Sequence, residues 1–237
     1  MLEEGDMKAK VLFEDLGKTD YKKAWNYQEK LFNAVLKEKR KNDHPADKPL
    51  NYLLFCEHPH VFTLGKSGEE NNFLIDEEFL KKINATYYRI NRGGDITYHG
   101  PGQIVGYPIL DLEQFNLQVK KYIYHLEEAV IKTLKSYGIE GHHLEKSSGV
   151  WLDTDDPQKT RKICAIGVRA SHFVTMHGFA FNINTDLNYF NYINPCGFTD
   201  KGVTSMEKEL GKKVNIEEVK EKLKSNIEKI FDMEIVE

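Results

Sequence analysis

The spacing of apolar residues along the chain predicts a mixture of strands and helices. Short apolar or alternating runs, which are typical of strands, are followed by turn residues and separated by stretches with helical spacing. Strands in pairs with separated helices favour an α+β or mixed α/β fold over a regular βαβ winding. Strands are predicted over residues 8–14, 51–56, 61–64, 87–91, 104–110, 149–152, 162–170 and 176–184.

Helix signals divide the rest of the chain. Asp20, Asp76 and Asn215 can cap helices that follow them, and residues 116–137 form a long amphipathic segment that stops at Gly138. Residues 37–48 are charged and without periodicity, which predicts a solvated connection. We expect a single domain over residues 1–237, with mixed sheets flanked by helices and a small helical segment from about residue 201.

Composition and charge narrow the class of protein. A chain of 237 residues that is 40% hydrophobic can bury a substantial core, and its net charge of −4 argues against a generally basic nucleic-acid binder. Its three cysteines are odd in number and widely spaced, which favours a reducing compartment over a disulfide framework or a zinc site. Neither a secretory signal nor an apolar run of about 18 residues is present. We therefore expect a cytoplasmic protein with neither nucleic-acid nor membrane partners.

Residues 92–103 form the densest group of unusual residues. This glycine-rich loop holds four glycines and a proline among polar side chains, between two predicted strands. Glycine allows positive φ and lets a ligand approach the backbone, so a binding loop is favoured over an elaborate turn. Gly65-Lys66-Ser67 resembles the end of a phosphate loop, but that motif needs a glycine where His60 stands.

The cysteines differ in their surroundings. Cys196 lies in a turn, Asn194-Pro195-Cys196-Gly197, whose flanking residues favour an exposed thiol. Cys164 is a competitor because it follows Lys162 by two residues and would share its face of a strand. Cys56 closes an apolar run and is predicted to be a packed core thiol. Residue types favour Cys196 as a nucleophile without excluding Cys164 or the absence of a catalytic cysteine. Lys162, embedded in an apolar strand, either reaches solvent from a sheet edge or is held for chemistry.

Four motifs in order along the chain strongly resemble the lipoate-pathway octanoyltransferases. The resemblance covers roughly residues 50 to 210 and implies the fold shared with lipoate and biotin protein ligases. Its motifs are residues 92–103; Arg161-Lys162 with residues 165–169; residues 177–180 with Asn182 and Asp186-Leu187; and residues 194–197 with residues 202–205.

The resemblance also implies an activity. It implies transfer of octanoyl from octanoyl-acyl carrier protein to a lysine of lipoyl domains, in 2-oxoacid dehydrogenase complexes and in the glycine cleavage H protein. Cys196 would form the thioester with Lys162 as its partner, whereas Cys164 departs from the family, which ordinarily has a small or apolar residue there. The residues implied to line the acyl pocket are Arg92, Gly93, Gly94, Asp95, Ile96, Thr97, Tyr98, His99, Ala165, Ile166, Gly167, His177, Gly178, Phe179 and Ala180.

A thioester donor carries its own activation, so such a transferase is expected to need no cofactor, neither ATP nor a metal. Two alternatives stay open: an ATP-dependent lipoate-protein ligase of the same fold, and a non-catalytic module that binds an acyl carrier. Because acyl carrier proteins are generally acidic, Arg92, Arg161, Arg169 or nearby lysines are candidates for a basic docking rim.

Overall fold

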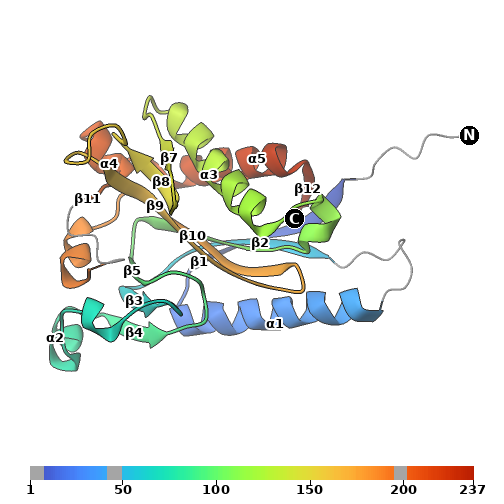
Figure 1. The fold of residues 1–237 in the computed structure, drawn as a ribbon, viewed down its shortest axis with the longest axis horizontal. Helices are drawn as coiled ribbons and strands as arrows, with labels where there is room; N and C mark the ends of the chain where they lie inside the picture. The colour runs from blue at the N-terminus through green and yellow to red at the C-terminus, as the bar shows by residue number, and fades with distance from the viewer. Residues whose placement is uncertain (1–7, 42–49, 195–201) are drawn as a thin grey trace, which may run out of the picture.

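The computed structural model describes residues 8–41, 50–194 and 202–237, whose strands form two sheets. The larger sheet has the order β12-β1-β2-β6-β10-β9-β8-β7, with β11 beside β9 (Figure 1). The smaller has the order β4-β3-β5, with β3 (Val61–Leu64), β4 (Thr86–Arg89) and β5 (Ile96–His99). The strands of the larger sheet are β1 (Ala9–Lys18), β2 (Asn51–Glu57), β6 (Gln103–Ile109), β7 (His142–Leu144), β8 (Ser147–Leu152), β9 (Arg161–Ser171), β10 (Val174–Asn182), β11 (Gly202–Val203) and β12 (Met233–Val236).

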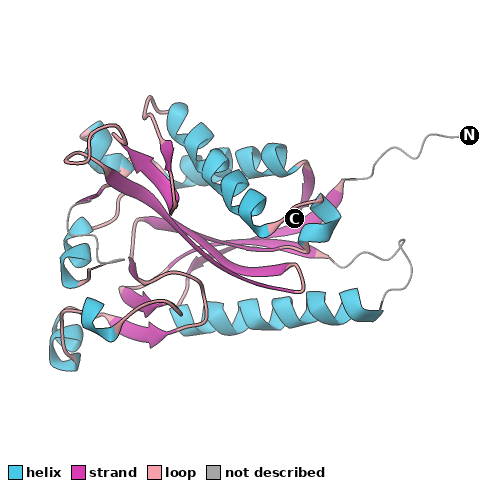
Figure 2. Cartoon of the chain, viewed as in Figure 1, coloured by secondary structure: helices cyan, strands magenta, loops and turns pink. Residues whose placement is uncertain are grey.

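Helices cover both faces of the larger sheet (Figure 2). The long helix α1 (Tyr21–Lys41) lies along one face, and α3 (Val119–Lys135) and α5 (Ile216–Phe231) pack together on the other. Two short helices, α2 (Glu77–Lys82) and α4 (Met206–Leu210), lie in the connections, as do 3-10 turns at Glu70–Asn72, Leu112–Phe115 and Leu187–Tyr192. Within the described ranges, no helix has the length and hydropathy that a membrane-spanning segment requires.

The central strands are apolar on both faces because successive side chains of a strand point in opposite directions. In β2, Leu53 and Phe55 belong to the core beneath α3 and α5, whereas Leu54 and Cys56 belong to the core beneath α1. All four are at most 1% exposed. This pattern explains why β2 reads as a continuous apolar run in the sequence.

The predicted strands all correspond to strands of the structure, and the helix signals are confirmed. The carboxylate of Asp76 accepts a hydrogen bond from Phe79 N at 2.8 Å, and Asn215 caps α5 in the same way. Gly138, with φ of 75°, follows the end of α3. Capping chemistry therefore placed these helix ends correctly.

Five segments differ from the prediction, and two of them are the short strands β7 and β11, which were not predicted. Helix α1 continues to Lys41, so the charged segment that was expected to be a connection from residue 37 is helical at least to that residue. Its Lys, Glu and Arg residues are good helix formers, and Lys39 pairs with Glu113 at 2.9 Å. Strand β5 lies inside the glycine-rich loop, where glycines conceal a four-residue strand. Strand β12 also escaped prediction, and it pairs in parallel with β1 from the far end of the chain.

Candidate active site

The candidate site is a cavity of about 560 Å³ that opens where β9 loses one neighbour. Strand β8 pairs with β9 only as far as Cys164, while farther along β9 Gly93 N of the glycine-rich loop donates to Val168 O at 2.9 Å. Between these two attachments, residues 165–167 of β9 line the cavity. Its volume is within the range of small-molecule sites.

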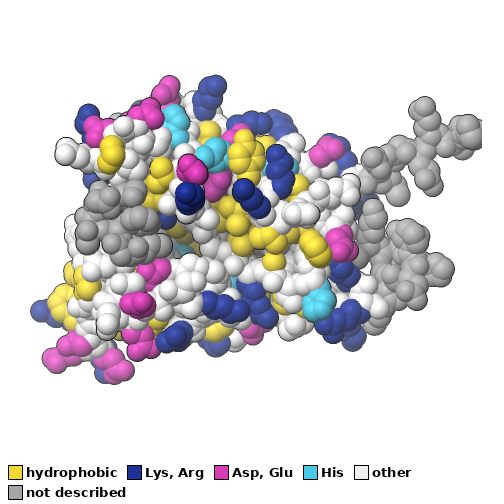
Figure 3. Space-filling view, viewed as in Figure 1, with side chains coloured by type: hydrophobic (Ala, Val, Ile, Leu, Met, Phe, Trp, Pro, Cys, Tyr) yellow, Lys and Arg dark blue, Asp and Glu magenta, His cyan; other side chains and the backbone are white. Residues whose placement is uncertain are grey.

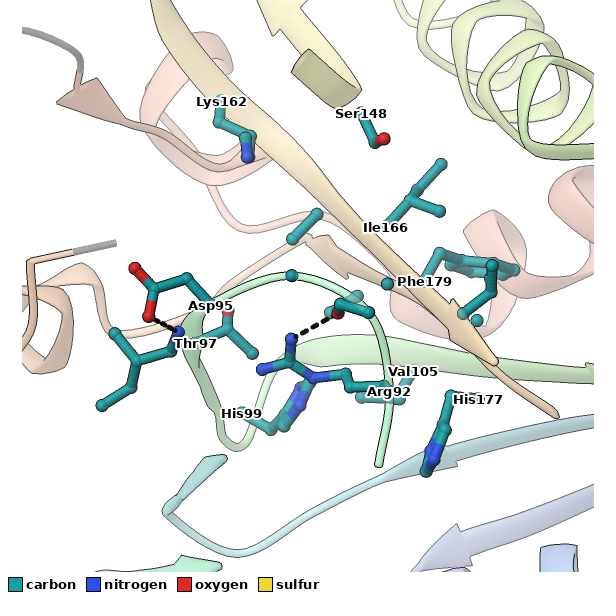
Figure 4. Close-up of a pocket in the computed structure, with 18 of the residues that line it drawn as sticks. Arg92, Asp95, Thr97, His99, Val105, Ser148, Lys162, Ile166, His177 and Phe179 are labelled. Atoms are coloured by element: carbon teal, nitrogen blue, oxygen red, sulfur yellow. Dashed lines mark hydrogen bonds between the residues drawn. The ribbon is translucent and has the colours of Figure 1, made fainter. Parts of the chain in front are cut away.

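The glycine-rich loop is held by its own polar side chains. The buried guanidinium of Arg92 donates from Nη2 to Thr63 O at 2.7 Å and to Thr63 Oγ1 at 3.0 Å. It also donates from Nη1 to Gly93 O at 3.0 Å (Figure 4). The carboxylate of Asp95 accepts from Ile96 N at 2.7 Å and from Asn72 Nδ2 at 2.7 Å. These contacts fix the backbone that forms one wall of the cavity.

Two glycines outside the loop allow its close approach. A Cβ atom on Gly65 would lie 2.2 Å from Gly94 O, and one on Gly167 would lie 2.9 Å from Gly93 O. Both distances are shorter than real Cβ contacts. Glycine at these positions therefore lets the loop lie against both β9 and the end of β3.

The structure brings together the pocket residues that the family resemblance implied, with one exception. Tyr98 does not line the cavity; it is fully buried next to Phe62 and Tyr189, and its hydroxyl lies 2.7 Å from His60 Nδ1. Thr97 and His99 lie on the face of β5 opposite to Tyr98, whereas Ile96, at the start of the strand, lies on the same face as Tyr98 and still lines the cavity. The cavity is lined by Arg92, Gly93, Gly94, Asp95, Ile96, Thr97, His99, Ala165, Ile166, Gly167, His177, Gly178, Phe179 and Ala180.

Several lining residues were missed because they come from distant elements and belong to no motif. Tyr21 comes from α1, Ile123 from α3 and Trp151 from β8. Amphipathic spacing predicted that such residues face the protein interior, but it carried no sign that this interior contains a cavity. Five others lie within the family motifs but were not assigned to the pocket, namely Gln103, Val168, Asn182, Gly202 and Val203. The remaining ones are Val105, Tyr107, residues 146–148 and Phe190.

Lys162 lines the cavity and is half-buried, with its Nζ 4.4 Å from the centre of the Trp151 ring. Its strand is flanked on both sides at this point, since Lys162 pairs with Trp151 of β8 and with Val203 of β11. Thr204 N also donates to Lys162 O at 2.9 Å. Lys162 is therefore not a sheet-edge lysine.

The predicted nucleophile, Cys196, lies outside the described residues. Cys164 and Cys56 are fully buried, and burial raises the pKa of both thiols. Neither is among the described residues that line the cavity. Because the thiolate is the reactive form of cysteine, these two are poor candidates for catalysis.

Uncharged histidines contribute polar groups to the cavity. Burial lowers the pKa of both His99 and His177 to about 3, so both are neutral near pH 7. His99 Nδ1 lies 2.9 Å from Gln103 Oε1, and His177 Nε2 lies 2.8 Å from Asn91 Oδ1. The cavity thus combines these neutral histidines with apolar walls, while Arg92, Asp95 and Lys162 add charged groups to its lining.

His143 bridges two carboxylates. Its Nδ1 lies 2.7 Å from Glu127 Oε2 and its Nε2 lies 2.7 Å from Glu128 Oε1. Burial lowers its pKa, but the hydrogen bonds that Glu128 and Glu127 accept from the ring outweigh burial and leave the pKa above its ordinary value. His143 and the two glutamates do not form a metal site, and no group of three or more His, Cys, Asp or Glu in the described ranges is placed to hold a metal.

The three arginines expected in a docking rim do not form one. Arg92 is buried, Arg161 is paired with Glu209, and Arg169 packs over the ring of Phe32 at 5.0 Å. On the face shown in Figure 3, Lys and Arg side chains are scattered among Asp and Glu. These three arginines are therefore engaged within the protein, and a docking rim that includes nearby lysines stays a prediction.

Comparisons with known proteins agree with this architecture. Residues 20–228 match the model of the lipoyl protein ligase A/B catalytic domain, and the chain belongs to this family. It is 58% identical over 203 residues to an octanoyltransferase of Bacteroides fragilis strain YCH46, with 86% of this chain and 90% of that protein covered. It is also 55% identical over 233 residues to an octanoyltransferase of Flavobacterium psychrophilum, covering 97% of this chain and all (100%) of that protein.

Solved structures confirm the expected fold. A bipartite lipoate protein ligase from Thermoplasma acidophilum has a TM-score of 0.66 at 17% identity, covering 98% of this chain and 86% of that one. A lipoate-protein ligase A bound with ATP has the same TM-score and identity, covering 98% of this chain and 88% of that one. At this level of identity the likeness concerns the fold alone.

Proposed function

We propose that this protein is an octanoyltransferase that carries the acyl group as a thioester on Cys196 and passes it to a lysine of a lipoyl domain. The observation that carries the proposal is Lys162, held between two neighbouring strands at one end of the cavity, in a chain 52–58% identical to named octanoyltransferases. The likeness to ATP-bound ligase concerns fold alone, so these relatives favour the transferase over the ATP-dependent alternative.

In the first half-reaction, the Cys196 thiolate attacks the carbonyl carbon of the carrier thioester. The bond from that carbon to the pantetheine sulfur breaks, and the pantetheine thiolate leaves and takes up the proton of the Lys162 ammonium, which becomes a neutral amine. An ammonium such as that of Lys162, about 4 Å from the Cys196 sulfur, would stabilise the thiolate by roughly 4 kcal/mol at an effective dielectric of 20. The nucleophile would then be present at neutral pH.

In the second half-reaction, the amine of the acceptor lysine attacks the acyl-enzyme. Lys162, which loses its counter-ion when Cys196 is acylated, accepts the proton of the amine as the amide forms and the thiolate departs. The described chain supports this pairing, because Val203 and Thr204, which follow Cys196 in the sequence, are hydrogen-bonded along Lys162. One lysine would therefore serve both steps.

The cavity provides the site for the acyl chain. Ile166, Phe179 and Val105 line it beneath the glycine-rich loop (Figure 4), and each methylene buried there contributes about 0.8 kcal/mol. The neutral state of His99 and His177 avoids burying a charge beside a hydrocarbon. As donor and acceptors we propose octanoyl-acyl carrier protein, and the lipoyl domains of 2-oxoacid dehydrogenase complexes and the glycine cleavage H protein. A cytoplasmic location is part of the same proposal.

Mass spectrometry after incubation with octanoyl-acyl carrier protein tests the proposal. Peptide mapping should locate an octanoyl group on Cys196, and the Cys196→Ala variant should lose both the adduct and turnover. Cys164→Ala is the matched control and should keep both. Label on Cys164 with none on Cys196 would contradict the assignment, and a requirement for ATP would favour the ligase.

A further inference from the structure

The position of the Phe179 ring depends on a glycine that does not line the cavity. Gly106 of β6 is paired with Phe179 of β10 on one side and with Phe55 of β2 on the other. Phe179 is in turn paired with Ile166 of β9. The row across the sheet therefore runs from Phe55 through Gly106 and Phe179 to Ile166, with a missing side chain at its second position.

The tip of the Phe179 ring occupies the space above Gly106. A Cβ atom on Gly106 would lie 2.1 Å from Cζ of Phe179, 2.3 Å from its Cε1 and 2.7 Å from its Cε2. Real Cβ atoms essentially never approach other atoms this closely. Gly106 therefore permits the Phe179 ring to lie over the sheet, away from Ile166.

The space around the ring limits where it can move. On the side of β2, Phe55 is fully buried, with its ring centre 6.1 Å from that of Phe179 and 5.2 Å from that of Phe13. On the opposite side, Phe179 and Ile166 line the cavity. A ring displaced from Gly106 meets packed aromatic side chains in one direction and unfilled space in the other, so it moves into the cavity.

We propose that Gly106 sets the length of the linear acyl chain that the cavity accepts, by holding the Phe179 ring out of its apolar end. This inference rests on the proposed function, because it assumes that the cavity holds an acyl chain. A side chain at position 106 would shorten the cavity without touching the ligand. A smaller side chain at position 179 would lengthen it.

The expected changes in kcat/KM follow from room in the cavity for one or two methylene groups of the acyl chain, which the variants would remove or add. Each buried methylene is worth about a fourfold change in equilibrium constant. Gly106→Ala should therefore lower kcat/KM for octanoyl relative to hexanoyl carrier protein by about fourfold or more. Phe179→Leu should raise kcat/KM for decanoyl relative to octanoyl carrier protein by about the same factor.

The experiment compares kcat/KM for hexanoyl-, octanoyl- and decanoyl-acyl carrier protein in both variants. Gly141→Ala is the matched control: a Cβ there would lie 2.9 Å from both Leu134 Cδ1 and Val150 Cγ1, which do not line the cavity, so preference should stay unchanged. Unchanged preference in Gly106→Ala would overturn the inference. If that variant does not fold, unchanged preference in Phe179→Leu overturns it instead.

Calorimetric binding of hexanoic, octanoic and decanoic acids separates this inference from the proposed function. If the wild-type chain transfers no acyl group, the proposed function is refuted. A shift of fatty-acid binding toward the shorter chain in Gly106→Ala, relative to wild type, would still support the role of Gly106. Transfer by the wild type with no shift in either measurement refutes the role of Gly106 alone.

Discussion

Replacing Glu209 by Gln should destabilise the protein at neutral pH through the loss of one ion pair. Arg161, at the start of β9, donates from Nε to Glu209 Oε1 at 2.8 Å and from Nη2 to Glu209 Oε2 at 2.6 Å. The Thr204 hydroxyl donates to the same carboxylate. The two charged side chains are only 24% and 17% exposed, so this pair joins β9 to α4 in a partly desolvated setting.

The size of the effect follows from the bonds lost. A hydrogen bond to a charged group is worth about 1.5–3 kcal/mol, and the bidentate pair contains two such bonds. A glutamine keeps at most one of them, and that bond has only the strength of a hydrogen bond to a neutral acceptor. Allowing for partial exposure, the loss is about 2 kcal/mol. With a urea m-value of about 2–3 kcal/mol/M, the unfolding midpoint should fall by about 0.7–1 M.

The pH dependence gives a second test. Hydrogen bonds from Arg161 lower the pKa of Glu209 below its ordinary value of 4.5. Its contribution is thus fully present above about pH 4.5 and is lost as the pH falls through the lowered pKa. Urea midpoints of wild type and Glu209→Gln should therefore differ at pH 7 and converge in acid. Glu207→Gln, on the same helix, is the control, and a Glu209→Gln effect no larger than this control, or one that persists in acid, would refute the reasoning.

Three further predictions follow from the site. Lys162→Ala should slow both acylation and deacylation, and should move the pH midpoint of Cys196 alkylation upward by at most about three units; an unmoved midpoint in a thiol titration, with the other cysteines replaced by alanine, would exclude the pairing. His143→Gln should cost up to about 1 kcal/mol at pH 6 and less at pH 8, because a raised folded pKa contributes stability that is lost as the pH rises through it; equal urea midpoint differences at both pH values would contradict this. Arg92→Lys should keep the charge but lose the forked contact with Thr63. Octanoate binding measured by calorimetry should therefore weaken about tenfold or more, as expected for the loss of one charge-assisted hydrogen bond. Unchanged octanoate binding would disprove this.

The elements that the sequence predicted well are those with strong local signals. The caps at Asp76 and Asn215 and the stop at Gly138 act through bonds within a few residues, so their signal lies in neighbouring positions. Strand β12 depends on pairing with β1, about 220 residues away, and four residues carry too little pattern to show it. Strand β5 was not predicted because the glycines on either side of it favour a loop.

The site was predictable where a family motif carried it and not elsewhere. Lys162 and the glycine-rich loop are recognisable in the sequence, whereas Tyr21 and Ile123 reach the cavity from helices whose periodicity indicates only burial. The contacts that engage the rim arginines were not predictable for a different reason. Sequence gives the charge of Arg161 but not the position of Glu209, 48 residues later, which engages it.

We expect strand β9 to tolerate no change in length. Its eleven residues hold Lys162 beside β8 and β11, present residues 165–167 to the cavity and receive the loop at Val168. Inserting one residue would turn every later side chain to the opposite face, and would separate the lysine from the cavity wall that it serves. Insertions and deletions during evolution should instead fall in the turns of residues 153–160, which join β8 to β9 and whose length fixes no register.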